Sequence, residues 1–155
     1  MKSDKLEELL TEHDFYLDFK LHPIFARYKQ LYHIDNSRVS ITDAKVNEVE
    51  YSIFITDFSS FVFDFVYLKK PILYFLPDQD LFKAGFNDYR ELDLPIEDGF
   101  GELALNAEEA VEAIERLLDT GRKIQLGYEE KYQDFFLYYD DQQRERFYHA
   151  LTNGD

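Results

Sequence analysis

The sequence contains no cysteine and no tryptophan, and it has a single methionine. The absence of cysteine excludes disulfide bonds, thiolate nucleophiles and cysteine-based zinc sites in these 155 residues, and it fits a reducing compartment. No apolar run approaches the ~18–20 residues of a membrane-spanning helix. The first residues, MKSDKLEELL, lack the apolar core of a secretory signal. We therefore expect a cytoplasmic chain that does not itself insert into a membrane.

Positive charge is also scarce. The chain has 17 lysine and arginine residues against 32 aspartate and glutamate residues, which gives a formal net charge of −15 at pH 7. Proteins that bind nucleic acids hold the phosphates with basic faces, so this balance argues against a nucleic acid partner. It also disfavours direct binding to anionic lipid. Lys20, Lys69 and Lys70 are close in the sequence to the loops that follow the expected strands, so a small anion can still find a locally favourable pocket there.

Apolar and aromatic residues are abundant, at 45% and 17% of the chain. This composition is too apolar for disorder, and the length is that of about one domain. We expect a single domain over residues 1–155, with helices from 106 to 155 at its C-terminal end. Runs of β-forming residues predict strands that alternate with short helices. The strands are expected at 15–20, 38–41, 51–56 and 71–76, and the helices at 24–32, 44–49 and 61–68.

The second half of the chain predicts mostly helix. Residues 79–101 have no clear period and predict a long irregular loop. Residues 106–118 predict a helix that Asn106 and Glu109 cap and that Gly121 ends. Two further helices are expected within 122–139 and at 142–151, the last with Phe147 and Leu151 facing inward.

The segment from Tyr51 to Asp78 is the most informative part of the chain. It predicts two parallel strands joined by a buried helix, so that the turn Asp57–Ser60 lies at the carboxyl edge of the sheet, where α/β proteins bind ligands. A helix that begins there, with free backbone N–H groups beside Ser59 and Ser60, is suited to an anion. The same serines are also among the commonest helix caps, so capping and phosphate binding both remain open.

Several short motifs occur in a fixed order along the first half of the chain. They are KLHP at 20–23, ITDFSS at 55–60, FDF at 63–65, KKPI at 69–72, YF at 74–75 and PD at 77–78. Together they resemble the C-terminal half of the CDP-glycerol glycerophosphotransferases that polymerise teichoic acid. The likeness covers about residues 5–150. Asp18 and Phe58 are small departures from the family pattern.

The resemblance implies a fold and a reaction. The fold is the C-terminal half of a GT-B transferase, a Rossmann-like three-layer α/β/α domain with a mostly parallel sheet. The reaction is attack by a hydroxyl of a polymer or lipid-linked acceptor on the β-phosphorus of CDP-glycerol or CDP-ribitol, with release of CMP. The resemblance implies no further cofactor and no metal. It places the full-length bacterial enzyme at the inner face of the plasma membrane and the acceptor site in another domain, so that this chain alone is expected to be inactive.

The resemblance also assigns roles to individual residues. Ser59 and Ser60 are expected to bind the diphosphate of the donor, and His22 to act as the base or to stabilise the departing CMP. Lys20 adds positive charge near the phosphates, although lysines at strand ends are usually only solvated. From its position alone, Asp57 is expected to orient the serine turn. Asp78 ends a strand at the same edge, where it either meets a ribose or alditol hydroxyl or has no role in binding. Without the family motif, His22 is more simply a structural residue.

Three further expectations concern other residues. Asp64 is expected to bond a neighbouring backbone or basic group, because an unpaired buried carboxylate is costly. The tyrosines at 128, 132, 138 and 139 are expected to form an exposed patch that supports a homo-oligomer. Two other functions compete with the transferase: a non-catalytic nucleotide-binding or interaction domain, and a GT-B transferase that uses another activated sugar.

Overall fold

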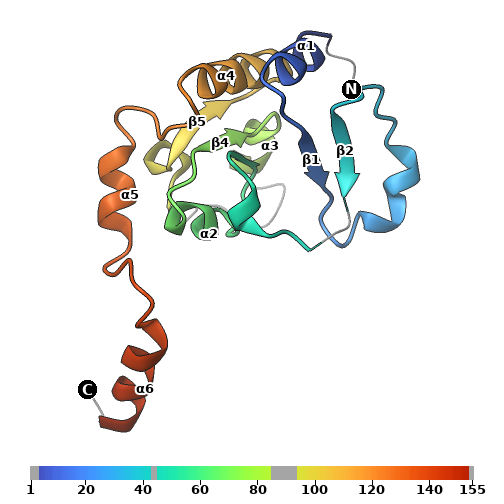
Figure 1. Cartoon of the computed structure of the whole chain (residues 1–155). Helices are drawn as coiled ribbons and strands as arrows, with labels where there is room; N and C mark the ends of the chain where they lie inside the picture. Colours follow the sequence, from blue (N-terminus) through green and yellow to red (C-terminus); the bar gives the residue numbers. More distant parts are fainter. Residues whose placement is uncertain (1–3, 43–44, 85–93, 154–155) are drawn as a thin grey trace.

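The computed structural model describes residues 4–42, 45–84 and 94–153 (Figure 1). Its strands form two sheets in which every pair is parallel. The first sheet pairs β1 (Leu17–Lys20) with β2 (Val39–Thr42), and the second has the order β3 (Phe54–Thr56), β4 (Ile72–Phe75), β5 (Gly101–Ala104). The expected parallel α/β architecture is confirmed, with two sheets in place of one continuous sheet.

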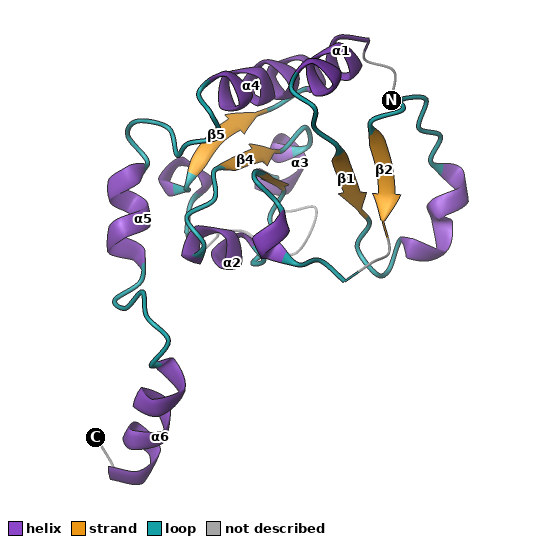
Figure 2. Ribbon diagram, viewed as in Figure 1, coloured by secondary structure: helices purple, strands orange, loops and turns teal. Residues whose placement is uncertain are grey.

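Helices cover both faces of the second sheet. The α-helices of the described residues are α1 (Asp4–Glu12), α2 (Val62–Tyr67), α3 (Gln79–Lys83), α4 (Ala107–Asp119), α5 (Glu129–Phe135) and α6 (Gln143–Asn153). α1 and α4 lie together on one side of the sheet, and α2 lies on the other side (Figures 1 and 2). The protein therefore has the three-layer α/β/α arrangement of a Rossmann-like domain. Among the described residues, no helix is both long enough and apolar enough to cross a bilayer.

The layer formed by α1 and α4 is held by leucine-rich stripes. Leu6, Leu9 and Leu10 of α1 recur at a helical spacing and are buried against α4. α4 contributes its own stripe to the same core, which includes Ile114 and Leu117. A fully buried side chain of this size contributes about 1.5–3 kcal/mol, so this layer is a main source of stability.

The opposite layer is aromatic. Phe65 of α2 is 1% exposed and stacks on Phe54 of β3 with ring centroids 4.0 Å apart. Tyr132 of α5 is equally buried, and its hydroxyl donates to the carbonyl of Lys70 at 2.8 Å. These contacts fix α2, and with it the turn that precedes α2, on the sheet.

α4 has the predicted ends. The side chain of Asn106 accepts a hydrogen bond of 3.0 Å from the amide of Glu109, whose carboxylate accepts one of 2.7 Å from the amide of Leu105. The first bond satisfies one of the first amide groups of the helix, and the second ties the residue before the cap to the first turn. Gly121 follows with φ +73°, the left-handed conformation that commonly ends a helix.

The expected irregular loop over 79–101 is wrong in part, because the segment contains α3 and ends at the first residue of β5. β5 has the sequence GELA, which lacks the β-branched residues that identify strands. Its position depends on Gly101, where a Cβ atom would lie 1.9 Å from the carbonyl oxygen of Ile72. Only glycine permits this close approach. Residues 85–93 of the expected loop lie outside the described residues.

Other boundaries also differ from expectation. The helix expected at 24–32 is a 3-10 helix at Ala26–Leu31, and the one expected within 122–139 is limited to α5. Of the helix expected at 44–49, residue 44 lies outside the described residues, and a 3-10 turn occupies Glu48–Glu50.

The inward orientation of Phe147 and Leu151 is wrong. These side chains of α6 are 68% and 70% exposed, and α6 extends away from the sheets (Figure 1). Helical spacing predicts an apolar face but does not supply a surface that buries it. The expected exposed patch of four tyrosines is also wrong, because Tyr132 belongs to the core, Tyr128 and Tyr139 are half-buried, and Tyr138 is the one exposed member of the four.

Candidate functional site

The serine turn lies where the sequence predicts it. β3 ends at Thr56, residues 57–61 turn, and α2 begins at Val62. Since β3 and β4 are parallel, this turn lies at the carboxyl edge of their sheet. The side chains of Asp57, Ser59 and Ser60 are all exposed there.

The backbone of this turn is bonded within itself. The amide of Phe61 donates to the Oγ of Ser59 at 3.3 Å, and the amides of Val62 and Phe63 donate to the carbonyls of Ser59 and Ser60 at 3.2 Å. The expectation of free amide groups at the start of α2 is therefore wrong for residues 61–63. These bonds are long for N–H···O contacts, whose usual length is about 2.9–3.0 Å.

The two serines consequently differ. Ser59 accepts a bond within the turn, and Phe61 rather than a serine occupies the cap position of α2. The hydroxyl of Ser60 has no hydrogen-bond partner within the described parts of the chain. An exposed hydroxyl at the edge of a parallel sheet can donate to a phosphate oxygen without losing a bond to the protein.

Asp78 reaches the same edge from the neighbouring strand. Thr56 pairs with Tyr74 in the β3–β4 register, and the chain continues from β4 through Pro77 to Asp78 and α3. The carboxylate of Asp78 is exposed. The structure thus brings Asp57, both serines and Asp78 to one edge of one sheet.

Lys20 and His22 lie at the end of β1, in the other sheet. Both side chains are exposed. The Nδ1 atom of His22 accepts a hydrogen bond of 3.3 Å from the amide of Ile24, and the ring meets that of Phe25 edge-on. A neutral imidazole that accepts at Nδ1 carries its proton on Nε2, so Nε2 is the atom that can donate to a ligand.

Asp18 connects the two sheets. Its carboxylate accepts a hydrogen bond of 2.7 Å from Ser40 of β2 and one of 2.9 Å from the hydroxyl of Tyr51, which precedes β3. The bond to Asp18, together with burial, raises the pKa of Tyr51 above its usual value. Asp18 therefore has a structural role in joining the two sheets.

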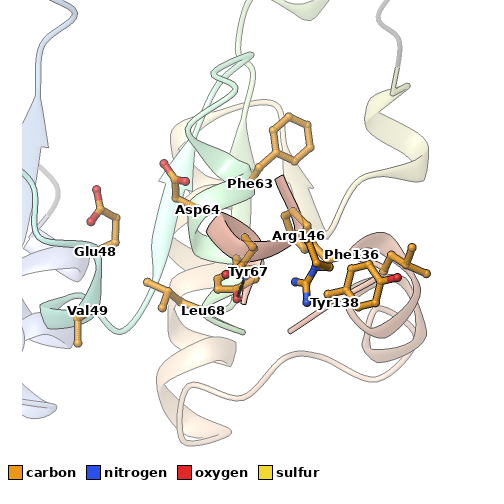
Figure 3. Close-up of a pocket in the computed structure, with 11 residues that line it drawn as sticks. Glu48, Val49, Phe63, Asp64, Tyr67, Leu68, Phe136, Tyr138 and Arg146 are labelled. Carbon is orange, nitrogen blue, oxygen red and sulfur yellow. Dashed lines mark hydrogen bonds between the residues drawn. The ribbon is translucent and has the colours of Figure 1, made fainter. Parts of the chain in front are cut away.

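A wide cleft lies elsewhere among the described residues. It has a volume of about 750 Å³ and opens on the outer side of α2, between that helix and the segment that joins α5 to α6 (Figure 3). Aromatic side chains and the carboxylates of Glu48 and Asp64 line it, while Arg146 is paired with Asp140 at 2.8 Å. None of the six candidate residues, all of which the structure describes, lines this cleft. Its two acids disfavour a diphosphate.

Asp64 does not behave as expected. Its side chain is exposed at the cleft rather than buried in α2, so it needs no basic partner.

The lysines of the KKPI motif follow α2 at its C-terminal end, as predicted. Lys69 and Lys70 donate their amides to Val66 and Phe65 at 2.9 Å, and Lys69 has the left-handed φ of 54°. They precede β4, so they lie at the amino edge of the sheet, opposite the serine turn. Their charge therefore does not serve the turn.

Two polar residues at the carboxyl edge are buried although no sequence motif singles them out. Thr56 and Gln79 are 7% and 9% exposed, and they are the buried polar residues other than tyrosine in the described parts of the chain. Thr56 ends β3, and Gln79 begins α3 just beyond β4. The burial of Thr56 is indicated by its place as the last, polar residue of the expected strand at 51–56. Nothing in the sequence indicates the burial of Gln79, because it begins the segment expected to be an irregular loop.

Comparison with known proteins identifies the relatives of the chain. The sequence model of the family described as CDP-glycerol:poly(glycerophosphate) glycerophosphotransferase matches residues 2–153. The minor teichoic acid biosynthesis protein GgaB of Bacillus subtilis (strain 168) is 32% identical over 105 residues, which are 67% of this chain and 11% of that protein. The teichoic acid poly(glycerol phosphate) polymerase of the same strain is 34% identical over 86 residues, which are 54% of this chain and 11% of that protein.

No solved structure matches the chain. The chain spans about a tenth of the length of its curated relatives. The family match nevertheless covers nearly every residue from end to end, including the serine turn, the KLHP motif and all strands. The chain belongs to the CDP-glycerol:poly(glycerophosphate) glycerophosphotransferase family.

Proposed function

We propose that this chain forms the donor-binding part of a transferase that adds glycerol phosphate from CDP-glycerol to a teichoic-acid-type polymer and releases CMP. CDP-ribitol is the related donor with the same diphosphate. The observation that carries the proposal is the exposed turn between β3 and α2, where the Ser60 hydroxyl has no partner within the described residues. Family membership over residues 2–153 supports it.

The serines act on the diphosphate through their hydroxyls. Ser60 donates to a phosphate oxygen, and Ser59 holds the turn by accepting from the amide of Phe61. Hydrogen bonds to a charged acceptor are stronger than neutral ones, which suits an anion at this edge. Asp57 orients the turn, and Asp78 accepts from a hydroxyl of the ribose or the alditol.

His22 acts as a hydrogen-bond donor to the departing phosphate. A neutral imidazole that accepts from Ile24 at Nδ1 has its proton on Nε2, and this N–H can donate to the phosphate as the bond to CMP breaks. The same bond disfavours the opposite tautomer, which a base acting through Nε2 requires. This geometry favours leaving-group stabilisation over the role of base, and Lys20 adds positive charge beside it.

Transfer needs parts beyond these residues. In phosphoryl transfer the protein contributes mainly position and charge, so the acceptor hydroxyl must be held in line with the β-phosphorus. The curated relatives are about nine times longer than the matched region, and we assign the acceptor site and the association with the inner membrane face to such additional sequence. The chain alone therefore binds the donor without turning it over.

Calorimetric titration of the chain with CDP-glycerol, CDP-ribitol, CMP and UDP-glucose tests this function. The expected result is binding of the cytidine ligands and no binding of UDP-glucose. Preference for UDP-glucose would instead indicate a transferase that uses another activated sugar. Absence of binding to all four ligands would favour an interaction domain.

A further inference from the structure

The carboxyl edge of the second sheet holds an unusual concentration of buried polar groups. Thr56 and Gln79 are more than nine-tenths buried, while the other buried side chains of the described residues are apolar or tyrosine. Burial of a polar group is informative, because it costs free energy unless the group is hydrogen-bonded. The two residues belong to adjacent strands or follow them: Thr56 is the last residue of β3, and Gln79 begins α3 after β4.

The protein does not bond these side chains. Within the described residues, neither the Thr56 hydroxyl nor the side-chain carboxamide of Gln79 has a hydrogen-bond partner. The backbone amide of Gln79 donates to the carbonyl of Leu76 at 3.2 Å. The described residues also contain no sealed side-chain nitrogen or oxygen atom that lacks a partner. The polar atoms of Thr56 and Gln79 therefore keep contact with solvent at the edge, while the rest of each side chain is packed.

We propose that Thr56 and Gln79 form the floor of the donor site and bind hydroxyl groups of the donor. A hydroxyl and a carboxamide each donate and accept, so they can use both the donor and the acceptor capacity of a sugar or alditol hydroxyl, whereas a phosphate oxygen uses only their donor capacity. This inference rests on the proposed function. In this proposal the carboxyl edge of the sheet has two parts: the serine turn binds the diphosphate, and Thr56 with Gln79 binds the hydroxyl groups.

The position of Asp78 supports this division. Asp78 immediately precedes Gln79 and is exposed. A carboxylate, which accepts hydrogen bonds, and a carboxamide, which donates and accepts them, therefore belong to consecutive residues just after β4. Adjacent hydroxyls of a ribose, or of glycerol, can use both groups. Burial of the Thr56 and Gln79 side chains fixes their rotamers before the ligand arrives, which lowers the entropic cost of binding.

Near-isosteric apolar variants test the proposal. Thr56→Val and Gln79→Met keep the volume and remove the hydrogen-bonding groups. Each is expected to lower affinity for CDP-glycerol about 3- to 10-fold, the effect of one hydrogen bond, with an unchanged or higher melting temperature. Thr56→Ser keeps the hydroxyl and is expected to retain affinity. Ser52→Ala, at the amino edge of the sheet, is the matched control and is expected to bind as the unaltered chain does.

The same titrations identify which hydroxyls are bound. A loss that also appears with CMP indicates the ribose, whereas a loss seen with CDP-glycerol and glycerol 3-phosphate but not with CMP indicates the alditol, and both outcomes support the proposal. Unchanged affinity in Thr56→Val and Gln79→Met overturns it and leaves the proposed function intact. A melting temperature lowered by several degrees in these variants also overturns it, because the side chains would then bond the protein. If the unaltered chain binds no cytidine ligand, the proposed function fails and this inference fails with it.

Discussion

Tyr51 donates a hydrogen bond of 2.9 Å to the carboxylate of Asp18, and this bond joins the first sheet to the segment that enters the second. Asp18 also accepts from Ser40, so one side chain holds β1, β2 and the approach to β3. The candidate residues are divided between these two sheets, with His22 in one and the serines in the other. The geometry of the site therefore depends on such bonds between the sheets.

Replacement of Tyr51 by phenylalanine removes this bond. Because the site is largely exposed to solvent, we expect a loss of only about 0.5–1 kcal/mol in the free energy of unfolding near neutral pH. The bond raises the pKa of Tyr51 above 10.0, so its contribution is complete below pH 10.0 and declines as the pH rises through the higher pKa of the folded protein. Urea unfolding of the variant and the unaltered chain should converge at high pH. Tyr148→Phe, at an exposed site on α6, is the control and should show no difference at any pH.

Gly101→Ala tests the pairing of β4 with β5. The added Cβ would lie 1.9 Å from the carbonyl oxygen of Ile72, a backbone atom that cannot move aside without separating the strands. We expect a loss of about 3 kcal/mol or more in the free energy of unfolding. Gly127→Ala is the comparison, because a Cβ there meets nothing within 4 Å and only its φ of +97° is strained. Equal losses in both variants would contradict the close approach at Gly101.

Tyr132→Phe tests the attachment of α5 to the sheet. The variant keeps the buried ring and leaves the carbonyl of Lys70 without its donor, so we expect a loss of about 1–2 kcal/mol. Tyr138→Phe removes a hydroxyl from a side chain that is 49% exposed, and its ring remains under Arg146. Thermal unfolding should give a lower melting temperature for Tyr132→Phe than for Tyr138→Phe. A Tyr132→Phe protein at least as stable as the unaltered chain would contradict the hydrogen bond to Lys70.

The proposed tautomer of His22 predicts a difference between two variants. The amide nitrogen of a glutamine can occupy the position of Nε2, so His22→Gln should retain affinity for CDP-glycerol. His22→Ala removes the donor and should weaken binding about 3- to 10-fold. Equal loss in both variants would show that the ring itself, or its Nδ1 atom, contacts the ligand. Titration calorimetry measures the affinity of both variants for CDP-glycerol, and circular dichroism checks that each is folded.

The sequence predicts those parts of the fold whose residues carry local signals. α4 has its cap at Asn106, its apolar stripe and its terminal Gly121, and all three are present in the structure. The serine turn follows from an apolar strand and a helix that Pro71 limits. These features depend on neighbouring residues, so a linear pattern is sufficient to find them.

Features that depend on distant contacts could not be predicted in the same way. β5 is recognisable only from the approach of Gly101 to Ile72, and the exposure of Phe147 only from the absence of a covering surface among the described residues. At the site, the sequence indicates the serines but not the bonds that engage the amides of residues 61–63. Burial of Thr56 and Gln79 likewise follows from the packing of two strands and not from local sequence.

The proposed binding of the diphosphate depends on the hydroxyls of the serine turn, so their removal tests it. Ser60→Ala should weaken binding of CDP-glycerol about tenfold or more, because a charge-assisted hydrogen bond is lost, while the melting temperature stays within a degree or two of that of the unaltered chain. Ser37→Ala is the matched control. The hydroxyl of Ser37 bonds Glu7 at 2.6 Å and lies far along the chain from the turn, so this variant should bind CDP-glycerol as the unaltered chain does. Titration calorimetry on the three proteins gives the answer. A folded Ser60→Ala chain that binds CDP-glycerol as tightly as the unaltered chain would contradict the claim that this turn holds the diphosphate.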